Sequence, residues 1–494
     1  MSRPDVHQLF NELETEWKEI EEEAVEILRK LIQMDTQNIG EDTNETIAAK
    51  HLKGLFESAG IECSDVLEEK PGRGNLVARI RGDGSSGLGA VMLSAHLDTV
   101  RAPKLDWKAE GWKHDPFGAV IDQEDGCLYG RGAVDMKNMA AMSVSVFLFI
   151  KRHGIMLARD LLFVAVADEE AHGSKYGAKY LVEKHPDLIE ADIIMTEVGG
   201  CSTYADGKEF FPVEIAEKTS VLVTITANGS GGHSSLFHPD NPIGRIGAVC
   251  NALSTKMLRH RVTPAARSML EGISKLLPWY KAPVFRNLLS PKLEPWIIDY
   301  LLTKKQAQAI IPVLHNIANP TVVHAGDQQN QIPSSASVTV DVRRIPGCSL
   351  DDTLDDLREV IGKEKFLPSV DSTGEKVAPE LVLEVMFPME GVVQDAEEPK
   401  VKEALECLHK VVYARSGGSP VIPFLLSGGT DMKFFVKHPT KKPVCLGFSP
   451  VRIPQGIEFP SLFHAVNERI PVDGYKWGLG VLCEVVFELC KAHR

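Results

Sequence analysis

Short apolar runs alternate with amphipathic segments over the first 216 residues of the chain. Runs with the length and composition of buried strands occur near residues 75–81, 89–95, 161–167 and 192–196. Apolar side chains recur with helical spacing over residues 7–35, 138–153 and 174–185. Because strands and helices alternate in this way, we predict an α/β fold with a mostly parallel central sheet.

The pattern changes near residue 217. Apolar and polar residues alternate, as in antiparallel strands with one exposed face, at residues 220–226, 338–342 and 381–385. Helical patterns lie between them, near residues 242–257 and 350–362. Two helices on one face of a small sheet predict an inserted α+β domain of the ferredoxin-like kind.

This second domain is predicted to span residues 217–388. Within it, residues 258–318 are basic and rich in leucine and proline, which indicates a helical insertion. The alternation of helices and strands resumes after residue 389. The α/β domain is therefore predicted to be discontinuous, with residues 1–216 and 389–494.

Composition limits the classes of function. The chain has 494 residues and a formal net charge of -14 at pH 7. This acidic balance argues against a nucleic-acid partner, which would require a basic face. Nine scattered cysteines without a Cys-x-x-Cys pair indicate reduced thiols. No apolar run approaches the roughly 20 residues of a membrane span, so we expect a cytoplasmic protein without a membrane partner.

Histidine and acidic residues follow several of the predicted strands. His96 and Asp98 come directly after the strand at 89–95, and their spacing indicates a metal ligand with a carboxylate that fixes the imidazole tautomer. The other candidates are Asp135, Glu169, Glu170, Glu197 and His464. Two histidines and three carboxylates suit two divalent metals that share a bridging carboxylate, and a further carboxylate can act as a general base.

These residues belong to motifs that follow one another along most of the chain. The motifs are residues 94–100 (SAHLDTV), 115–117 (DPF), 129–137 (YGRGAVDMK), 167–170 (ADEE), 231–235 (GGHSS), 330–333 (NQIP), 341–343 (DVR), 427–431 (SGGTD) and His464. In this order they resemble the M20 family of metallopeptidases and amidohydrolases, which includes aminoacylases, carboxypeptidases, desuccinylases and dipeptidases. The resemblance implies a two-metal catalytic domain and a lid or dimerisation domain.

The resemblance also implies a role for each metal-site residue. The five implied ligands are Asp135 as the bridge, His96 and Glu197 on one metal, and Glu170 and His464 on the other. Glu169 is then the general base, and Asp98 supports His96. Zinc is the expected metal, with cobalt and manganese as alternatives, because three of the five ligands are carboxylates.

Residues of the second domain are expected to contact the substrate. The resemblance implies that His233 reaches the active site of the other subunit and stabilises the oxyanion there, so we expect a homodimer. It also implies that Arg343 and Asn330 hold a substrate carboxylate, for which a guanidinium offers two parallel donors. Neighbouring strand residues face opposite ways, so only one of Arg343 and Arg344 can point into the pocket, and we favour Arg343.

The predicted function is hydrolysis of an amide or peptide bond in N-acyl amino acids or short peptides with a free carboxylate. Glu169 would activate a water that bridges the metals, and Gly429 and Thr430 would line the substrate pocket through their backbone amides. One alternative is a dipeptidase or aminopeptidase that recognises a free amine. The others are a non-catalytic binding protein on the same scaffold and a two-metal phosphatase.

Overall fold

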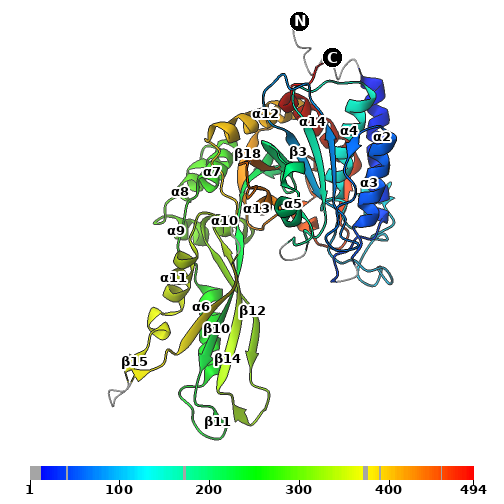
Figure 1. Cartoon of the computed structure of the whole chain (residues 1–494). Coiled ribbons are helices and arrows are strands. Elements are labelled where there is room, and N and C mark those ends of the chain that lie inside the picture. Colours follow the sequence, from blue (N-terminus) through cyan, green and yellow to red (C-terminus); the bar gives the residue numbers. More distant parts are fainter. Residues whose placement is uncertain are drawn as a thin grey trace.

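A nine-stranded sheet forms the centre of the larger part of the molecule in the computed structural model (Figure 1). The structure describes residues 13–40, 43–170, 174–370, 376–388, 391–457 and 459–493. Residues 7–12 of the first predicted helix and the predicted domain boundary at residue 389 lie outside these ranges.

The strands of this central sheet follow the order β1-β2-β6-β3-β7-β19-β9-β18, with β8 paired to β9. Their bounds are β1 Glu62–Cys63, β2 Leu76–Ile80, β3 Val91–His96, β6 Leu161–Val166, β7 Ile193–Thr196, β8 Thr203–Ala205, β9 Lys208–Glu217, β18 Val421–Leu426 and β19 Val444–Gly447. The middle of the sheet, from β6 through β3 and β7 to β19, is parallel. The predicted α/β fold with a mostly parallel central sheet is confirmed.

Helices cover both faces of the central sheet because its strands are apolar on both sides. One face packs against α2 Glu14–Gln33, α3 Thr46–Ser58, α4 Lys137–Arg152, α12 Pro399–Ser416 and α14 Val472–Cys490. The other face packs against α5 Ala178–Lys184 and α13 Met432–Phe435. In β3, for example, Leu93 belongs to the first core and Met92 to the second. A small sheet of β4 Val120–Ile121, β5 Cys127–Tyr129 and β20 Arg469–Pro471 lies beside this body.

A separate four-stranded antiparallel sheet extends away from the central one (Figure 1). Its order is β12-β14-β10-β17, with bounds β10 Thr219–Asn228, β12 Ile317–Ala325, β14 Ser335–Arg344 and β17 Leu381–Pro388. Helices α6 Pro242–Thr255 and α11 Leu350–Ile361 cover one face through a core that includes Val249, Leu357 and Val340. This is the predicted ferredoxin-like arrangement, and we call it the lid.

Short elements complete the lid. At its far tip, β11 Gly232–His233 pairs with β13 Gln331–Ile332. A second short pair, β15 Ser369–Val370 with β16 Lys376–Val377, lies on a separate projection of the lid (Figure 1). Lys363–Phe366 forms a 3-10 turn after α11, and Pro186–Leu188 and Phe459–Leu462 are 3-10 turns outside the lid.

Residues 258–318, predicted as a helical insertion, contain α7 to α10, and their last two residues belong to β12. The helices of the insertion are α7 Pro264–Leu276, α8 Ala282–Asn287, α9 Glu294–Tyr300 and α10 Lys304–Leu314, and they share a small core of their own. Ile273 of α7 packs against Ile422 of the edge strand β18, so the insertion bridges the lid and the central sheet (Figure 1). Across the described ranges, no helix is both long and apolar enough to cross a bilayer.

Candidate metal centre

The candidate ligands converge because neighbouring parallel strands end at the same edge of the central sheet. His96 is the last residue of β3, and Glu169 and Glu170 follow the adjacent strand β6. Glu197 follows β7, the neighbour of β3 on its other side. Asp135 enters from the loop between β5 and α4. His464 enters from the segment before β20, which pairs with β5.

Asp135 lies between the two histidines, with one carboxylate oxygen toward each. Its Oδ1 is 3.1 Å from Nε2 of His96, and its Oδ2 is 3.0 Å from Nε2 of His464. The Asp135–Met136 peptide bond is cis. A carboxylate that presents its two oxygens to two different ligand sets has the geometry of a bridge between two cations.

The remaining carboxylates divide between the two histidines. Glu197 Oε2 is 3.7 Å from Nε2 of His96, and Glu170 Oε2 is 3.0 Å from Nε2 of His464. Glu169 offers an oxygen within 4.8 Å of ligand atoms of both His96 and Glu197. The structure thus brings together all six residues of the predicted metal and base set, and carboxylate with imidazole is a donor set that fits divalent metals.

Electrostatics also favour a cation at this place. Burial raises the pKa of Glu197 to about 7, with a further rise from the charges of Asp135 and Asp431. Burial also raises the pKa of Glu169 well above its ordinary value, and the charge of Glu197 adds to this effect. Hydrogen bonds to Asp135 and Glu170 raise the pKa of His464 to about 10. Carboxylates so crowded and desolvated require protons or bound cations to compensate their charge.

Asp98 lies against His96 and also holds the segment that carries Glu169 and Glu170. Nδ1 of His96 lies 3.0 Å from the backbone oxygen of Asp98, whereas the Asp98 carboxylate is 3.5 Å away. Because a carbonyl oxygen can only accept, Nδ1 carries the hydrogen and Nε2 is left to face the metal position. The Asp98 carboxylate also accepts the backbone N–H groups of Glu169 and Glu170, at 3.1 and 3.0 Å, and the Asn38 amide at 2.9 Å.

Sequence reasoning missed Glu468, which holds the loop that carries Asp135. Its fully buried carboxylate accepts the backbone N–H groups of Gly132, Val134 and Asp135, and it pairs with Arg131 at 2.8 Å. The residue stood four positions after His464 in the sequence. Most of its partners are backbone N–H groups, however, and the pattern of side chains in a sequence does not predict such contacts.

His233 and Asn330 lie together at the far tip of the lid, beyond the reach of their own metal centre (Figure 1). The Ser234 amide donates to the backbone oxygen of Asn330 at 3.1 Å, which joins the two loops. Arg343 lies at the opposite end of β14, near the central sheet. Within one chain, therefore, Asn330 and Arg343 do not meet, and they can share a substrate carboxylate only across two subunits.

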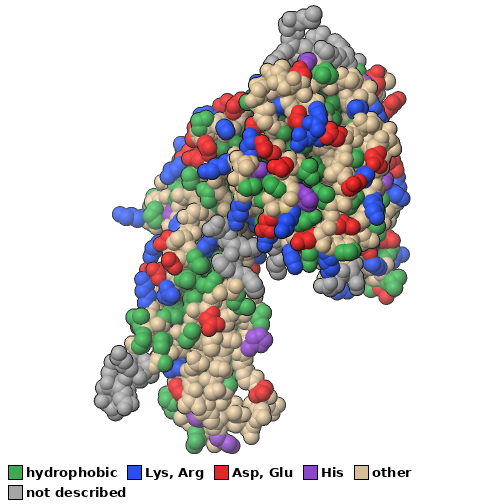
Figure 2. Space-filling view, in the orientation of Figure 1, with side chains coloured by type: hydrophobic (Ala, Val, Ile, Leu, Met, Phe, Trp, Pro, Cys, Tyr) green, Lys and Arg blue, Asp and Glu red, His purple; other side chains and the backbone are tan. Residues whose placement is uncertain are grey.

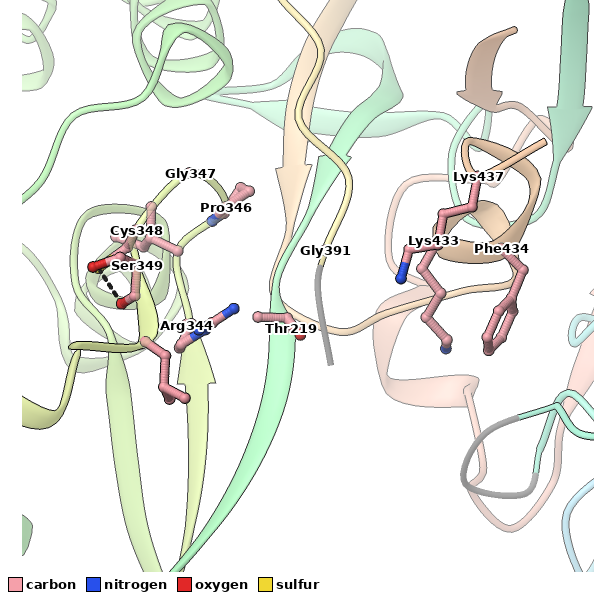
Figure 3. Close-up of a pocket in the computed structure, with 12 residues that line it drawn as sticks. Thr219, Arg344, Pro346, Gly347, Cys348, Ser349, Gly391, Lys433, Phe434 and Lys437 are labelled. Atoms are coloured by element: carbon pink, nitrogen blue, oxygen red, sulfur yellow. Dashed lines mark hydrogen bonds between the residues drawn. The ribbon is translucent and has the colours of Figure 1, made fainter. Parts of the chain in front are cut away.

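Arg343 and Arg344 face opposite sides of the lid sheet, as predicted for neighbouring strand residues. Arg343 lies on the uncovered face, where it pairs with Asp341 at 3.0 Å. Arg344 is buried on the other face and lines a cavity of about 680 Å³ between the lid and α13, together with Lys433 and Lys437 (Figure 3). None of the predicted site residues is among the residues that line this cavity.

Thr430 does not offer its backbone amide to a pocket. Its N–H and its hydroxyl both donate to Oε2 of Glu217, at 2.7 and 2.9 Å, and the side chain is buried. The prediction that this amide contacts substrate is therefore wrong for the described conformation. Gly429 is exposed beside it, and the ammonium of Lys433 lies close to the place that a Cβ would occupy there.

The sequence model of Peptidase family M20/M25/M40 matches residues 92–488. The chain belongs to this family. Membership makes it a metal-dependent peptidase or amidohydrolase. Among curated M20 relatives, the N-fatty-acyl-amino acid synthase/hydrolase PM20D1 of Xenopus tropicalis is 25% identical over 91% of this chain and 82% of its own length. A probable succinyl-diaminopimelate desuccinylase of Staphylococcus aureus is 27% identical over 66% of this chain and 70% of its own length.

Solved M20 structures share the fold at low identity. The metallo-carboxypeptidase Sso-CP2 of Sulfolobus solfataricus aligns with a TM-score of 0.63 at 15% identity, over 94% of this chain and 98% of its own. The dipeptidase Dug1p of Saccharomyces cerevisiae aligns with a TM-score of 0.61 at 16% identity, over 98% of both chains. The YXEP protein of Bacillus subtilis, described as a dinuclear metal-binding M20 peptidase, aligns with a TM-score of 0.58 at 13% identity, over 96% of this chain and 99% of its own.

Proposed function

We propose that this protein is a two-metal amidohydrolase that releases an amino acid from an N-acyl amino acid with a free carboxylate. The observation that carries the proposal is the position of Asp135, with one oxygen toward His96 and the other toward His464. The names of two relatives, a hydrolase of N-fatty-acyl amino acids and a desuccinylase, support an N-acylated amino acid as the substrate class.

Each ligand set would hold one metal, with Asp135 shared. His96 and Glu197 would complete one site, and Glu170 and His464 the other. When bound, a pair of divalent metals polarises a carbonyl and lowers the pKa of a water between them. We propose zinc, with cobalt or manganese as alternatives, because imidazole and carboxylate donors suit all three metals.

Glu169 is proposed as the general base. Its carboxylate lies beside His96 and Glu197, and none of the ion pairs in the described ranges engages it, so it is available to exchange a proton. It would take a proton from the attacking water and return it to the leaving amine. Burial raises its pKa above the ordinary value of a carboxylate, which increases its affinity for the proton of an attacking water.

The lid is proposed to supply the contacts to the substrate. Arg343 would hold the substrate carboxylate through its guanidinium. The partner subunit's His233 would approach the carbonyl oxygen, and the partner subunit's Asn330 would join Arg343 at the carboxylate. Both come from the partner because the tip that carries them points away from the metal centre of its own chain (Figure 1). A homodimer through the lid is supported by its edge strand β12, on which Val322 and Val323 are exposed.

Amine release from a panel of substrates tests the proposal. The metal-stripped protein, then the protein with zinc, cobalt or manganese restored, would be incubated with N-acyl amino acids of increasing acyl length, dipeptides and a phosphate monoester. We expect metal-dependent amine release from N-acyl amino acids. Release from dipeptides alone would favour the peptidase that recognises a free amine. Phosphate release alone would favour a phosphatase, and binding without turnover would favour a non-catalytic protein.

A further inference from the structure

The insertion exposes large aromatic side chains that the fold does not bury. The exposed fractions are 86% for Trp279, 57% for Tyr280, 55% for Trp296 and 73% for Tyr300. They form two ring pairs, with centroids 5.9 Å apart for Trp279 and Tyr280 and 6.0 Å apart for Trp296 and Tyr300. Exposed apolar patches of this kind mark a surface that contacts a protein partner or a membrane.

On α9 these side chains form a continuous stripe. Leu293, Trp296 and Tyr300 are spaced by three and four residues, so they share one face of the helix, and all three are exposed. The side of the helix that faces the rest of the insertion carries Ile297 and Ile298, which are buried in its core. The helix is therefore apolar on two sides. The side with Trp296 and Tyr300 has no protein against it within the described ranges.

The charge of the insertion differs from that of the chain as a whole. Residues 258–318 contain nine lysines and arginines and three acidic residues, a formal charge of +6 in a chain of net charge -14. Lys292 and Lys304 flank the stripe on α9, and neither takes part in an ion pair among the described residues. Asp299 is the one exposed acid on this helix. Basic side chains line the left edge of the molecule, over the insertion (Figure 2).

We propose that the insertion is a peripheral docking surface for an anionic phospholipid bilayer. Indole and phenol rings favour the boundary between headgroups and acyl chains, since one end of the ring system is apolar and the other can hydrogen-bond. Lysine stems lie along apolar surface while their ammonium groups reach anionic headgroups. A helix with an apolar stripe and flanking lysines lies in the plane of such an interface.

This inference goes beyond the proposed reaction and does not depend on it. From the sequence we expected no membrane partner, because no segment could span a bilayer. A surface helix that lies in the interface needs no spanning segment, so that criterion could not detect it. The contact also brings the enzyme to the phase in which amphiphilic acyl compounds concentrate.

Sedimentation with lipid vesicles tests the proposal on the full-length protein. Phosphatidylcholine vesicles with and without phosphatidylglycerol would be compared for the wild type, the double variant Trp296→Ser with Tyr300→Ser, and the variant Trp279→Ser. We expect binding to the anionic vesicles that weakens with added salt, and a loss of about tenfold or more in the double variant. Leu105→Ser, which removes an equally exposed apolar side chain outside the insertion, should bind as the wild type does.

Three results would overturn the proposal. The first is a wild type that does not sediment with anionic vesicles, and the second is a double variant that sediments as the wild type does. The third is light scattering in which the double variant, and not Leu105→Ser, loses an oligomer that the wild type forms. That last result would assign the surface to contacts between copies of the chain.

Discussion

The carboxylate of Glu468 accepts the backbone N–H of Asp135 at 3.1 Å, and so fixes the residue that faces both histidines. The same carboxylate holds the amides of Gly132 and Val134 and pairs with Arg131. The position of the candidate bridge therefore depends on a buried acid that is not itself a ligand.

Glu468→Gln should lower metal affinity without removing any ligand. The amide keeps one accepting oxygen but loses the charge that Arg131 compensates, so the loop around Asp135 is held less firmly. Loss of a group that supports ligands typically costs 10–100-fold in metal affinity, and we expect a loss of about this size. Metal titration of the stripped protein measures it. Glu110→Gln, which changes an exposed acid in the loop between β3 and β4, is the matched control. Equal metal affinities for the two variants would contradict the role of Glu468 in holding Asp135.

Glu169→Gln should abolish turnover while the metal content stays near that of the wild type. A general base contributes about 10²–10⁴-fold, so kcat should fall by at least this factor. Glu170→Gln, one residue away, should instead reduce metal content, since Glu170 lies 3.0 Å from His464 at the second ligand set. Elemental analysis and kcat for both variants separate the roles. Full activity of Glu169→Gln would contradict the role of Glu169 as the base.

Arg343→Lys should raise KM for a substrate with a free carboxylate. Lysine keeps the charge but not the two parallel donors, and hydrogen bonds to charged groups are worth about 1.5–3 kcal/mol, so an increase of about tenfold or more is expected. Arg344→Lys is the matched control, because that side chain faces the cavity on the other side of the lid sheet. A larger rise in KM for Arg344→Lys would transfer the role to the cavity.

Mixing two inactive variants should restore activity if His233 acts across the dimer. His233→Ala lacks the lid group, and Glu169→Gln lacks the base. A mixed dimer contains one site with an intact base and an intact partner lid. Random exchange of subunits should recover roughly a quarter of the wild-type activity. If both variants stay inactive after proven exchange, or if the active protein is a monomer, the role across subunits is excluded.

Lys218 should make stability depend on pH at the junction of the lid and the central sheet. Burial lowers its pKa to about 7, although Nζ donates to the backbone oxygen of His315. The unfolded chain retains the ordinary value of 10.5, so between these values the unfolded state binds more protons than the native state. The thermal midpoint of the wild type, relative to Lys218→Met, should therefore rise from pH 7 to pH 10. A constant difference across this range would contradict the lowered pKa of Lys218 in the folded protein.

Much of the metal centre could be predicted from sequence because strand ends fix it. His96, Glu170 and Glu197 lie at or after the ends of short apolar runs whose length and composition indicate buried strands, and parallel strands bring their ends to one edge. The fold of the lid is also predicted from sequence, because its strands alternate apolar and polar residues.

Other features depended on contacts that no pattern encodes. Glu468 accepts hydrogen bonds from backbone groups. The backbone N–H of Thr430 donates to Glu217, which lies at the end of β9. Helix α5 begins at Ala178 and not at Ser174, because Gly177 before it has non-helical dihedral angles and lies against the Ala167 carbonyl.

Anomalous diffraction from crystals grown with zinc tests the central claim most directly. We expect two peaks of comparable height, roughly 3.5–4 Å apart, one on each side of Asp135. One peak should lie near His96 and Glu197, and the other near His464 and Glu170. A single peak, or two peaks of which neither contacts Asp135, would contradict the shared bridge and the two-metal reaction built on it.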